Sequence, residues 1–373
     1  MSIISMKKNK KKTIIYFMYM IFILISTFKY FISNNIETKN ISFFTSPITV
    51  IFWIASVITI LLATVVFPRR KIYAISISII FIISISFLNT NILSALYVLL
   101  FWFFVSYSIT PVFYKKSMVL LFITIILLSY TLSLFNNYMN FDDRYGYTPT
   151  FGFENQNSFP QLLIILYILL SENIKKSFIF SIAFLLIGYL ININSRIFYL
   201  MLILSPLIVY LCQNLYFAQK SYITPLALFF FSIYSSYMLY TNEYLINLNV
   251  LLSNRFGFSH IYLENIMSIK TLLFGVNDAS LSTIPIPIDM SFIAMLVNNG
   301  LIVSLIYIFI YSISMKKMYI EKDYNALSIS ILMMLYATFE NVFINILLNP
   351  SIYYAVYYLT YSKIRSLAST NIK

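Results

Sequence analysis

The stretch SMVLLFITIILLSYTLSLF, residues 117–135, contains no charged residue over its 19 positions. A helix of that length extends about 30 Å, which matches the hydrocarbon core of a bilayer. Lys115 and Lys116 stand directly before it, and Asn136 and Asn137 follow it. A basic end and an uncharged polar end are typical of a membrane span whose basic end faces the cytoplasm.

The composition of the whole chain agrees with this stretch. Of 373 residues, 60% are hydrophobic and only 10% are charged, and the mean hydropathy is +0.85. These values exclude a soluble cytosolic enzyme, and six glycines and ten prolines exclude a collagen-like or linker-rich chain. We therefore expect an all-α polytopic membrane protein with about twelve spans. The apolar segments are 14–32, 48–67, 72–88, 92–113, 117–135, 157–171, 177–194, 197–218, 222–240, 291–314, 326–340 and 345–362.

The net charge of +13 could indicate a nucleic-acid partner, but the positions of the charges exclude one. With the N-terminus in the cytoplasm, 19 of the 25 Lys and Arg residues fall on the inner side. The positive-inside rule thus predicts that both termini are cytoplasmic. The run Lys7–Lys12 lacks a following small-residue cleavage site, so we interpret 14–32 as an uncleaved span.

Cysteine and histidine each occur once, as Cys212 and His260. A single cysteine excludes a disulfide framework and a cysteine-based zinc site. A single histidine excludes any metal site that needs two. We expect neither a metal nor another cofactor.

Two predicted outer loops, 136–156 and 241–290, are much longer than the inner connections, and loops of that size are usually functional or disordered. Nine of the twelve acidic residues lie on or near the same face. Apolar residues at helical spacing predict a membrane-surface helix near 245–272 that ends at Gly275. We expect a single transmembrane domain over 1–373, with the two loops forming a cap over the site.

Three arginines lie at this outer boundary: Arg144, Arg196 and Arg255. Guanidinium binds phosphate through paired hydrogen bonds and keeps its charge in a low-dielectric setting, so the three could hold a diphosphate. For any one of them, a lipid headgroup or an ion pair with a nearby loop carboxylate is an equally good explanation. The occurrence of all three together favours a shared anionic substrate.

The segment FGFENQNSFP, residues 151–160, leads into the short apolar segment 157–171. Asn157 or Ser158 can cap a helix whose first turn contains Pro160. The 12 residues from Pro160 to Ser171 are too few to cross a bilayer. The helix start is therefore either an anion site or a plain cap, and Gly152 could simply permit a tight turn.

The order of these features resembles the Wzy-type polymerases of O-antigen, capsule and exopolysaccharide repeat units, which are related to the O-antigen ligases. The resemblance covers about 140–300. It rests on motifs that recur in order along the outer face, and these are Arg144, Gly152-Phe153-x-Asn155-x-Asn157-x-x-Pro160, Asn194-Ser195-Arg196, Ser253-Asn254-Arg255, Leu273-Phe274-Gly275, Asp289-x-Ser291-Phe292 and Met295–Gly300. The chain departs from the family at Gln156, where proline is common, and after Arg196, where Ile-Phe replaces small residues.

The resemblance implies a GT-C-like fold and a metal-independent glycosyltransferase in the bacterial cytoplasmic membrane. Its substrate would be an undecaprenyl-diphosphate-linked oligosaccharide, with membrane lipid and a chain-length regulator protein as further partners. The growing glycan would pass to the incoming lipid-linked repeat unit at the outer face. Arg144, Arg196 and Arg255 would stabilise the leaving diphosphate as preorganised positive charge.

A base for the acceptor hydroxyl is less clearly marked. His260 lies one helical turn before Glu264 and suits base catalysis, although an interfacial histidine is an equally good interpretation. Other polar residues could act as the base or bind sugar hydroxyls. The substrate-binding candidates are Asp143, Gly152, Glu154, Asn155, Asn157, Asp289, Asn298 and Glu340. For Asn298, beside Asn299 and Gly300, a packing kink is the simpler interpretation.

Two other functions stay open. An O-antigen ligase would share the fold and the arginines but use a different acceptor. A repeat-unit flippase, which is not an enzyme, would be expected to show related halves and mid-membrane polar residues. The nearly charge-free spans favour an enzyme over a transporter.

Overall fold

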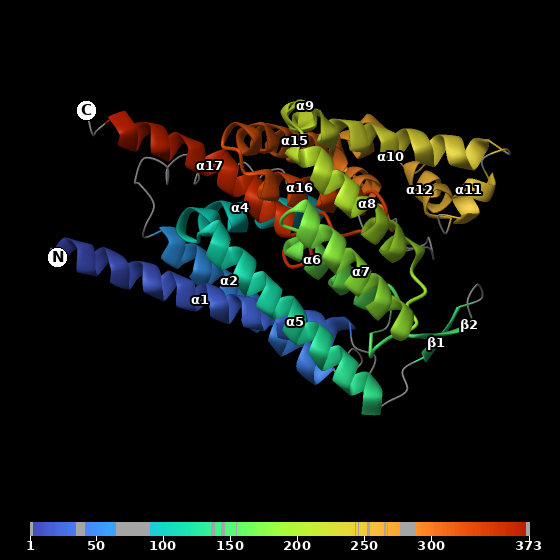
Figure 1. Ribbon diagram of the computed structural model, residues 1–373, viewed down its shortest axis with the longest axis horizontal. Helices are drawn as coiled ribbons and strands as arrows, with labels where there is room; N and C mark the ends of the chain where they lie inside the picture. The colour runs from blue at the N-terminus through green and yellow to red at the C-terminus, as the bar shows by residue number, and fades with distance from the viewer. Residues whose placement is uncertain are drawn as a thin grey trace. The chain divides into compact units, whose positions relative to one another are not determined.

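The computed structural model describes residues 3–34, 42–64, 90–135, 139–142, 146–153, 155–242, 244, 246–251, 254–264, 266, 268–276 and 288–370. Nearly all of these residues are helical (Figure 1). The chain forms two compact units, one of Met1–Phe67 with Phe104–Leu207 and one of Pro68–Phe103 with Ile208–Lys373. Two helices, α4 (Thr90–Ser108) and α8 (Arg196–Gln213), contribute residues to both units.

The first unit is a helical bundle with one small hairpin. Helix α1 packs on α2 and α5, and α6 packs on α5 and α7. Strands β1 and β2 pair antiparallel, with Met139 opposite Pro149 and Asp142 opposite Gly146. The bounds are α1 Ile3–Asn34, α2 Ser42–Thr64, α5 Pro111–Phe135, β1 Met139–Asp142, β2 Gly146–Pro149, α6 Ser158–Leu170 and α7 Ile174–Leu190.

The second unit is built around the long helix α15. Helices α10, α12, α13, α16 and α17 all pack on α15, and α10 also packs on α12. Asp323 caps α16 by accepting a hydrogen bond from the Ala326 backbone N–H at 2.9 Å. The bounds are α9 Leu215–Lys220, the 3-10 turn η1 Ser221–Ile223, α10 Thr224–Thr241, α11 Ile246–Leu251, α12 Arg255–Leu263, α13 Ile269–Phe274, α15 Ser291–Ile320, α16 Tyr324–Ala337 and α17 Pro350–Thr370.

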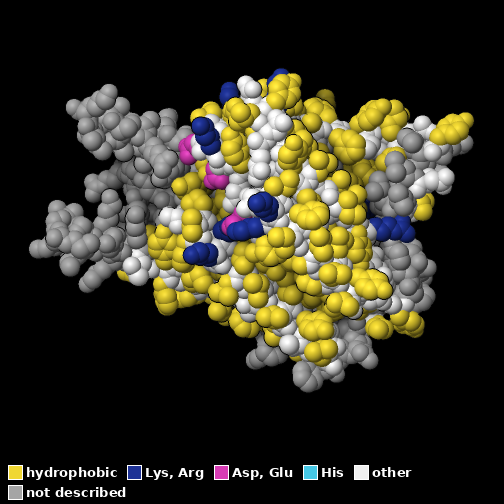
Figure 2. Space-filling view, viewed as in Figure 1, with side chains coloured by type: hydrophobic (Ala, Val, Ile, Leu, Met, Phe, Trp, Pro, Cys, Tyr) yellow, Lys and Arg dark blue, Asp and Glu magenta, His cyan; other side chains and the backbone are white. Residues whose placement is uncertain are grey.

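The protein is an all-α membrane protein by the length and composition of its helices. Within the described ranges, five helices are long and apolar enough to cross a bilayer, and these are Thr13–Asn34, Pro111–Leu134, Arg196–Gln213, Leu215–Thr241 and Ser291–Ile320. Hydrophobic side chains cover most of the described surface on the face shown in Figure 2. Helix α7 illustrates this, because Phe178 and Leu186 on it are 59% and 57% exposed. Such a surface suits lipid rather than water.

Most predicted apolar segments overlap one helix where the structure describes them, but several have other bounds. The segment 92–113 crosses the break between α4 and α5, 197–218 crosses the break between α8 and α9, and α17 begins only at Pro350 rather than at 345. The segment 72–88 lies outside the described residues. The short helix predicted at 157–171 is confirmed as α6, and Pro160 lies in its first turn. The segment 177–194 ends earlier than predicted, at Leu190, because the chain turns at Asn192 with a φ of 57°. The count of twelve spans, the GT-C-like fold and the single domain with its cap stay predictions.

The long loops differ from the sequence prediction in two ways. The single surface helix expected over 245–272 is wrong, because three short helices, α11, α12 and α13, occupy this region. Asn254 adopts a left-handed conformation with φ 58°, which separates α11 from α12, and a capping box at Ser268 starts α13 afresh. Gly275 ends α13 as predicted, with φ 79°. The β hairpin in 136–156 was not predicted.

Candidate functional site

The sequence-predicted site residues fall into three groups. Arg144, Asp143 and Glu154 lie outside the described residues. Another group, formed by Gly152, Asn155, Asn157 and Arg196, belongs to the first unit. The last group belongs to the second unit and contains Arg255, His260, Asp289, Asn298 and Glu340.

In the first unit, the segment before α6 forms a tight turn. Gly152 has a φ of 83°, as the turn interpretation requires. Asn157 is the N-cap residue of α6, but its side chain makes no capping hydrogen bond. The side-chain oxygen of Asn155 instead accepts a hydrogen bond from the Asn157 backbone N–H at 2.8 Å. The side-chain cap expected from Asn157 is therefore replaced by an Asx turn at Asn155, two residues earlier in the chain.

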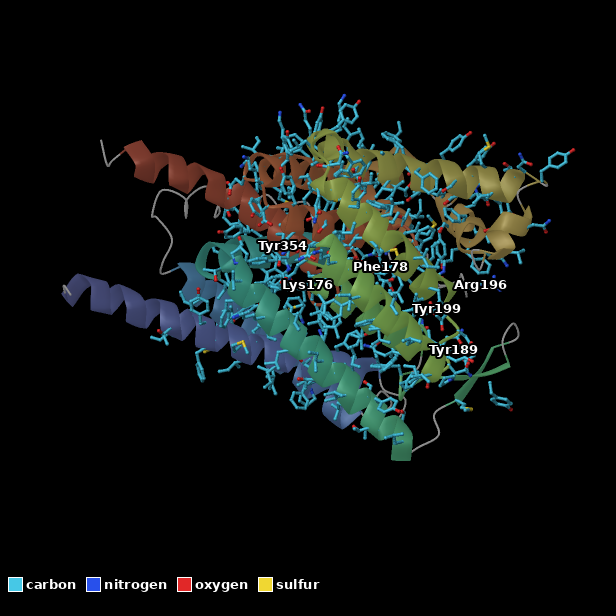
Figure 3. The ribbon with its side chains drawn as sticks, viewed as in Figure 1. Lys176, Phe178, Tyr189, Arg196, Tyr199 and Tyr354 are labelled. Carbon is cyan, nitrogen blue, oxygen red and sulfur yellow. The ribbon has the colours of Figure 1, made fainter. Side chains whose placement is uncertain are left out.

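Arg196 is the first residue of α8 and its side chain is exposed (Figure 3). The turn before it is closed by Tyr199, whose hydroxyl donates to the Ile193 carbonyl at 2.9 Å. A small pocket of about 10 Å³ lies between this turn and the start of α6, and Gln156, Asn157 and Asn194 help to line it. Such a volume holds about one water molecule, so this pocket is too small for a sugar.

In the second unit, Arg255 is buried between two carboxylates. Its Nη1 lies 2.7 Å from Glu340 Oε1, and its Nε lies 3.8 Å from Asp289 Oδ2. Nη1 also donates to the Phe339 carbonyl. The side chains of Arg255 and Glu340 are each 5% exposed, whereas Asp289 is 29% exposed. The sequence considered loop carboxylates as the ion-pair partners of Arg255, and Glu340 was not among them.

The electrostatics of this cluster follow from its charges. Burial lowers the pKa of the Arg255 guanidinium, but the Glu340 and Asp289 carboxylates outweigh that effect and raise the pKa above its usual value. Burial and the charge of Asp289 also raise the pKa of the neighbouring Tyr262. Arg255 thus stays charged, and it stands against two negative groups. The described residues contain no group of three or more His, Cys, Asp or Glu side chains that could hold a metal ion.

Ser291 fixes the backbone that carries Glu340. The Ser291 hydroxyl donates to the Glu340 carbonyl at 2.5 Å. It also accepts hydrogen bonds from the backbone N–H groups of Val342 at 2.8 Å and Phe343 at 3.1 Å. The first residue of α15 therefore holds the bend that follows α16, and this places Glu340 opposite Arg255.

His260 lies on α12, one helical turn before Glu264. The predicted pair is confirmed, with Nε2 at 3.3 Å from Glu264 Oε1. The imidazole stacks on the Tyr240 ring, with centroids 4.3 Å apart, and it is also close to Tyr237. Nδ1 is buried and has no hydrogen-bond partner among the described residues. If Nε2 carries the proton shared with Glu264, Nδ1 is a lone-pair acceptor.

An apolar groove of about 1210 Å³ runs between α10 and α15 and reaches α12. Its walls are mostly aromatic and aliphatic, and its ionisable groups other than tyrosine are His260 and Glu264. The lining residues are Ala227, Phe229, Phe230, Phe231, Ile233, Tyr234, Tyr237, His260, Leu263, Glu264, Ile266, Leu272, Leu296, Leu301 and Leu305. The groove lies along α10 and α15, which are both long and apolar enough to cross a bilayer, and the pair of His260 and Glu264 belongs to its lining.

Asn298 lies beside a kink in α15, as the simpler sequence interpretation predicts. Gly300 interrupts the helix with φ 78° and ψ 172°. The residues that follow α13 pack against this kink. Among them, the Val276 N–H donates a hydrogen bond to the Val297 carbonyl at 2.7 Å. A Cβ on Gly300 would lie 2.3 Å from the Leu273 carbonyl oxygen, so only glycine permits this approach.

Some site residues escaped the sequence analysis. Ser259 lies one helical turn after Arg255 in α12, so helical spacing alone could have predicted that the two share one face of this helix. Tyr240 carries no such signal, and Ser291 was noted only as part of the motif Asp289-x-Ser291-Phe292, because its hydrogen bonds join it to residues about fifty positions away. Comparisons with protein-family models, with curated proteins and with solved structures give no significant match to this chain.

Proposed function

We propose that this protein is a glycosyltransferase that polymerises undecaprenyl-diphosphate-linked oligosaccharide repeat units at the outer face of the bacterial cytoplasmic membrane. The observation that carries the proposal is the apolar groove between α10 and α15, whose lining includes His260 and Glu264. A substrate with a long isoprenoid chain and a polar head needs such a site. The choice of a polymerase among lipid-linked glycosyltransferases rests on the ordered motifs of the sequence, which resemble those of the Wzy-type family.

The reaction needs a base as well as a lipid site. The acceptor hydroxyl oxygen attacks the anomeric carbon of the donor sugar, and the bond from that carbon to the diphosphate oxygen breaks. The electron pair leaves with the diphosphate, and the hydroxyl proton passes to the His260 imidazole. Glu264 holds Nε2 at 3.3 Å, which orients the ring and stabilises the imidazolium that forms.

Stacking on Tyr240 supports this role for His260. The residue is 8% exposed and the Tyr240 ring stacks on one face of the imidazole, which restricts rotation of the ring. A base fixed in this way loses little entropy when it meets a positioned hydroxyl. Glu264 is 59% exposed, which gives the proton a route to water after transfer.

The test is the length of the glycan ladder in the host after the gene is deleted and then replaced. A polymerase predicts loss of the ladder, with single repeat units still attached to the outer acceptor, and recovery with the wild-type gene. If finished polymer accumulates on its lipid carrier instead, the protein is a ligase. If repeat units remain on the cytoplasmic face, it is a flippase. Either of these two results rejects the proposal.

A further inference from the structure

One face of α12 carries two buried polar atoms that make no hydrogen bond within the described part of the chain. Arg255 and Ser259 are four residues apart in this helix and so lie on the same face. Arg255 is 4% exposed and Ser259 is 1% exposed. Within the described part of the chain, neither Arg255 Nε nor Ser259 Oγ has a hydrogen-bond partner. Leaving a buried donor unsatisfied costs about 1–3 kcal/mol, so two on adjacent turns mark a place for an oxygen atom from outside the chain, either of water or of a ligand that displaces it.

The charge of the cluster decides whether the ligand oxygen belongs to an anion or to a neutral hydroxyl group. One guanidinium faces two carboxylates, Glu340 at 2.7 Å and Asp289 at 3.8 Å, so the cluster is net negative. A diphosphate would meet this negative charge in a low-dielectric setting, where repulsion is strong. A neutral hydroxyl has no such penalty. It can accept from Arg255 Nε–H or Ser259 Oγ–H and donate its own hydrogen to a carboxylate.

The surroundings also suit a sugar. Asp289 is 29% exposed and stands two residues before α15, so it forms the more open side of the cluster. Tyr262 shares the face of α12 with Ser259 and is 3% exposed. An aromatic ring beside hydroxyl-binding groups is an arrangement that accommodates the apolar and polar sides of a sugar ring together.

We propose that the face of α12 bearing Arg255 and Ser259, together with Asp289, is a subsite for the neutral hydroxyl groups of the acceptor sugar. This assignment differs from the role that the sequence suggested for Arg255, which was neutralisation of the diphosphate. The identification of the ligand as the acceptor glycan rests on the proposed function, whereas the preference for a neutral polyhydroxyl ligand rests on the cluster alone.

The test uses binding rather than turnover, so that it is separable from the test of the proposed function. The full chain in lipid nanodiscs is titrated with the phosphate-free, lipid-free repeat-unit oligosaccharide of its host, and separately with inorganic diphosphate. We expect Ser259→Ala to weaken oligosaccharide binding about 3- to 10-fold, as the loss of one hydrogen bond predicts, without changing diphosphate binding. Ser232→Ala is the matched control, because Ser232 is equally buried but already donates to the Leu228 carbonyl at 2.8 Å.

A second variant tests the charge argument independently of Ser259. Asp289→Asn removes one negative charge at a partly exposed position, and we expect it to weaken oligosaccharide binding while diphosphate binding stays the same or improves. The proposal is overturned if the wild type does not bind the oligosaccharide saturably, if Ser259→Ala acts like Ser232→Ala, or if either variant selectively weakens diphosphate binding. The two proposals can fail separately. If the protein binds the oligosaccharide through Ser259 but deletion of its gene leaves the glycan ladder unchanged, this inference holds and the polymerase assignment is rejected.

Discussion

Arg255 Nη1 and Glu340 Oε1 lie 2.7 Å apart, and each side chain is 5% exposed. The pair joins the loop helix α12 to the bend that follows α16. Removing one partner of a buried pair leaves the other charge without compensation, which costs far more than the net contribution of the pair itself. The pair is therefore a structural requirement for the geometry of the site.

Replacing Glu340 should destabilise the protein strongly. We expect Glu340→Ala to lower the free energy of unfolding by about 3–5 kcal/mol, because Arg255 would stay buried and charged. Denaturant unfolding of the purified protein in detergent measures this. Asp289→Ala is the control, since its carboxylate is 3.8 Å away and 29% exposed, and it should cost about 1 kcal/mol or less. Equal effects of the two variants would show that the Glu340 contact is not the dominant one.

Gly300 should tolerate no side chain. We expect Gly300→Ala to lower stability by about 3 kcal/mol or more, because its φ of 78° with ψ of 172° is open only to glycine and because a Cβ would meet the Leu273 carbonyl at 2.3 Å. Gly257→Ala is the comparison, since its Cβ would meet the Asn249 side chain at 2.7 Å, and a side chain can move. Thermal unfolding measures both. A Gly257 variant as unstable as the Gly300 variant would refute this account of the kink.

His260 should control the rate of glycan transfer. With purified protein and lipid-linked repeat units, we expect His260→Gln to lower kcat about 10²- to 10⁴-fold, the usual contribution of a positioned base. Glu264→Gln should lower it less, about 10-fold, because it only orients the ring. Tyr237→Phe, which keeps the groove wall and removes a hydroxyl, is the control and should have little effect. Full activity of His260→Gln would remove His260 from the mechanism.

The apolar groove should set the affinity for the lipid chain. Leu305 lines the groove, and Leu305→Trp should raise the KM for lipid-linked substrates several-fold by filling part of it. Phe309 lies on the same helix, is 65% exposed and does not line the groove, so Phe309→Trp is the matched control. The effect should shrink when a substrate with a shorter isoprenoid chain is used. An unchanged KM for Leu305→Trp would indicate that the lipid chain binds elsewhere.

Hydropathy and local chemistry allowed much of this fold to be predicted. The apolar runs predicted most of the helices. The short distance from Pro160 to Ser171 predicted the short helix α6, and Gly275 predicted the end of α13. These are local properties of a few neighbouring residues. The start of α12 within 245–272 depends on the left-handed conformation of Asn254. The presence of an asparagine alone does not predict that conformation.

The candidate site was harder to predict because its main contacts are distant in sequence. The His260–Glu264 pair follows from helical spacing and was predicted. The pairing of Arg255 with Glu340 joins α12 to the end of α16, and no periodicity connects them. Counting outer-face arginines suggested a phosphate site, whereas the position of Arg255 between two carboxylates depends on tertiary packing. Charge counts along the chain drew attention to Arg255, but they could not show that two carboxylates surround it.

Glu172 provides a test of pH dependence away from the candidate site. It pairs with Lys115 at 2.8 Å and with Lys176, and hydrogen bonds from these two lysines lower the pKa of its carboxyl from about 4.5 to about 2. A carboxyl with a lowered pKa stabilises the folded state above its unfolded pKa, and this contribution is lost as the pH falls from about 4.5 towards 2. We expect Glu172→Gln to reduce the thermal unfolding temperature slightly at pH 7, by an amount equivalent to about 1 kcal/mol or less, because the side chain is 40% exposed and water screens the pairs. The difference from wild type should shrink below pH 4.5, whereas a difference that is constant down to pH 2 would mean that packing, and not the charge of Glu172, is responsible.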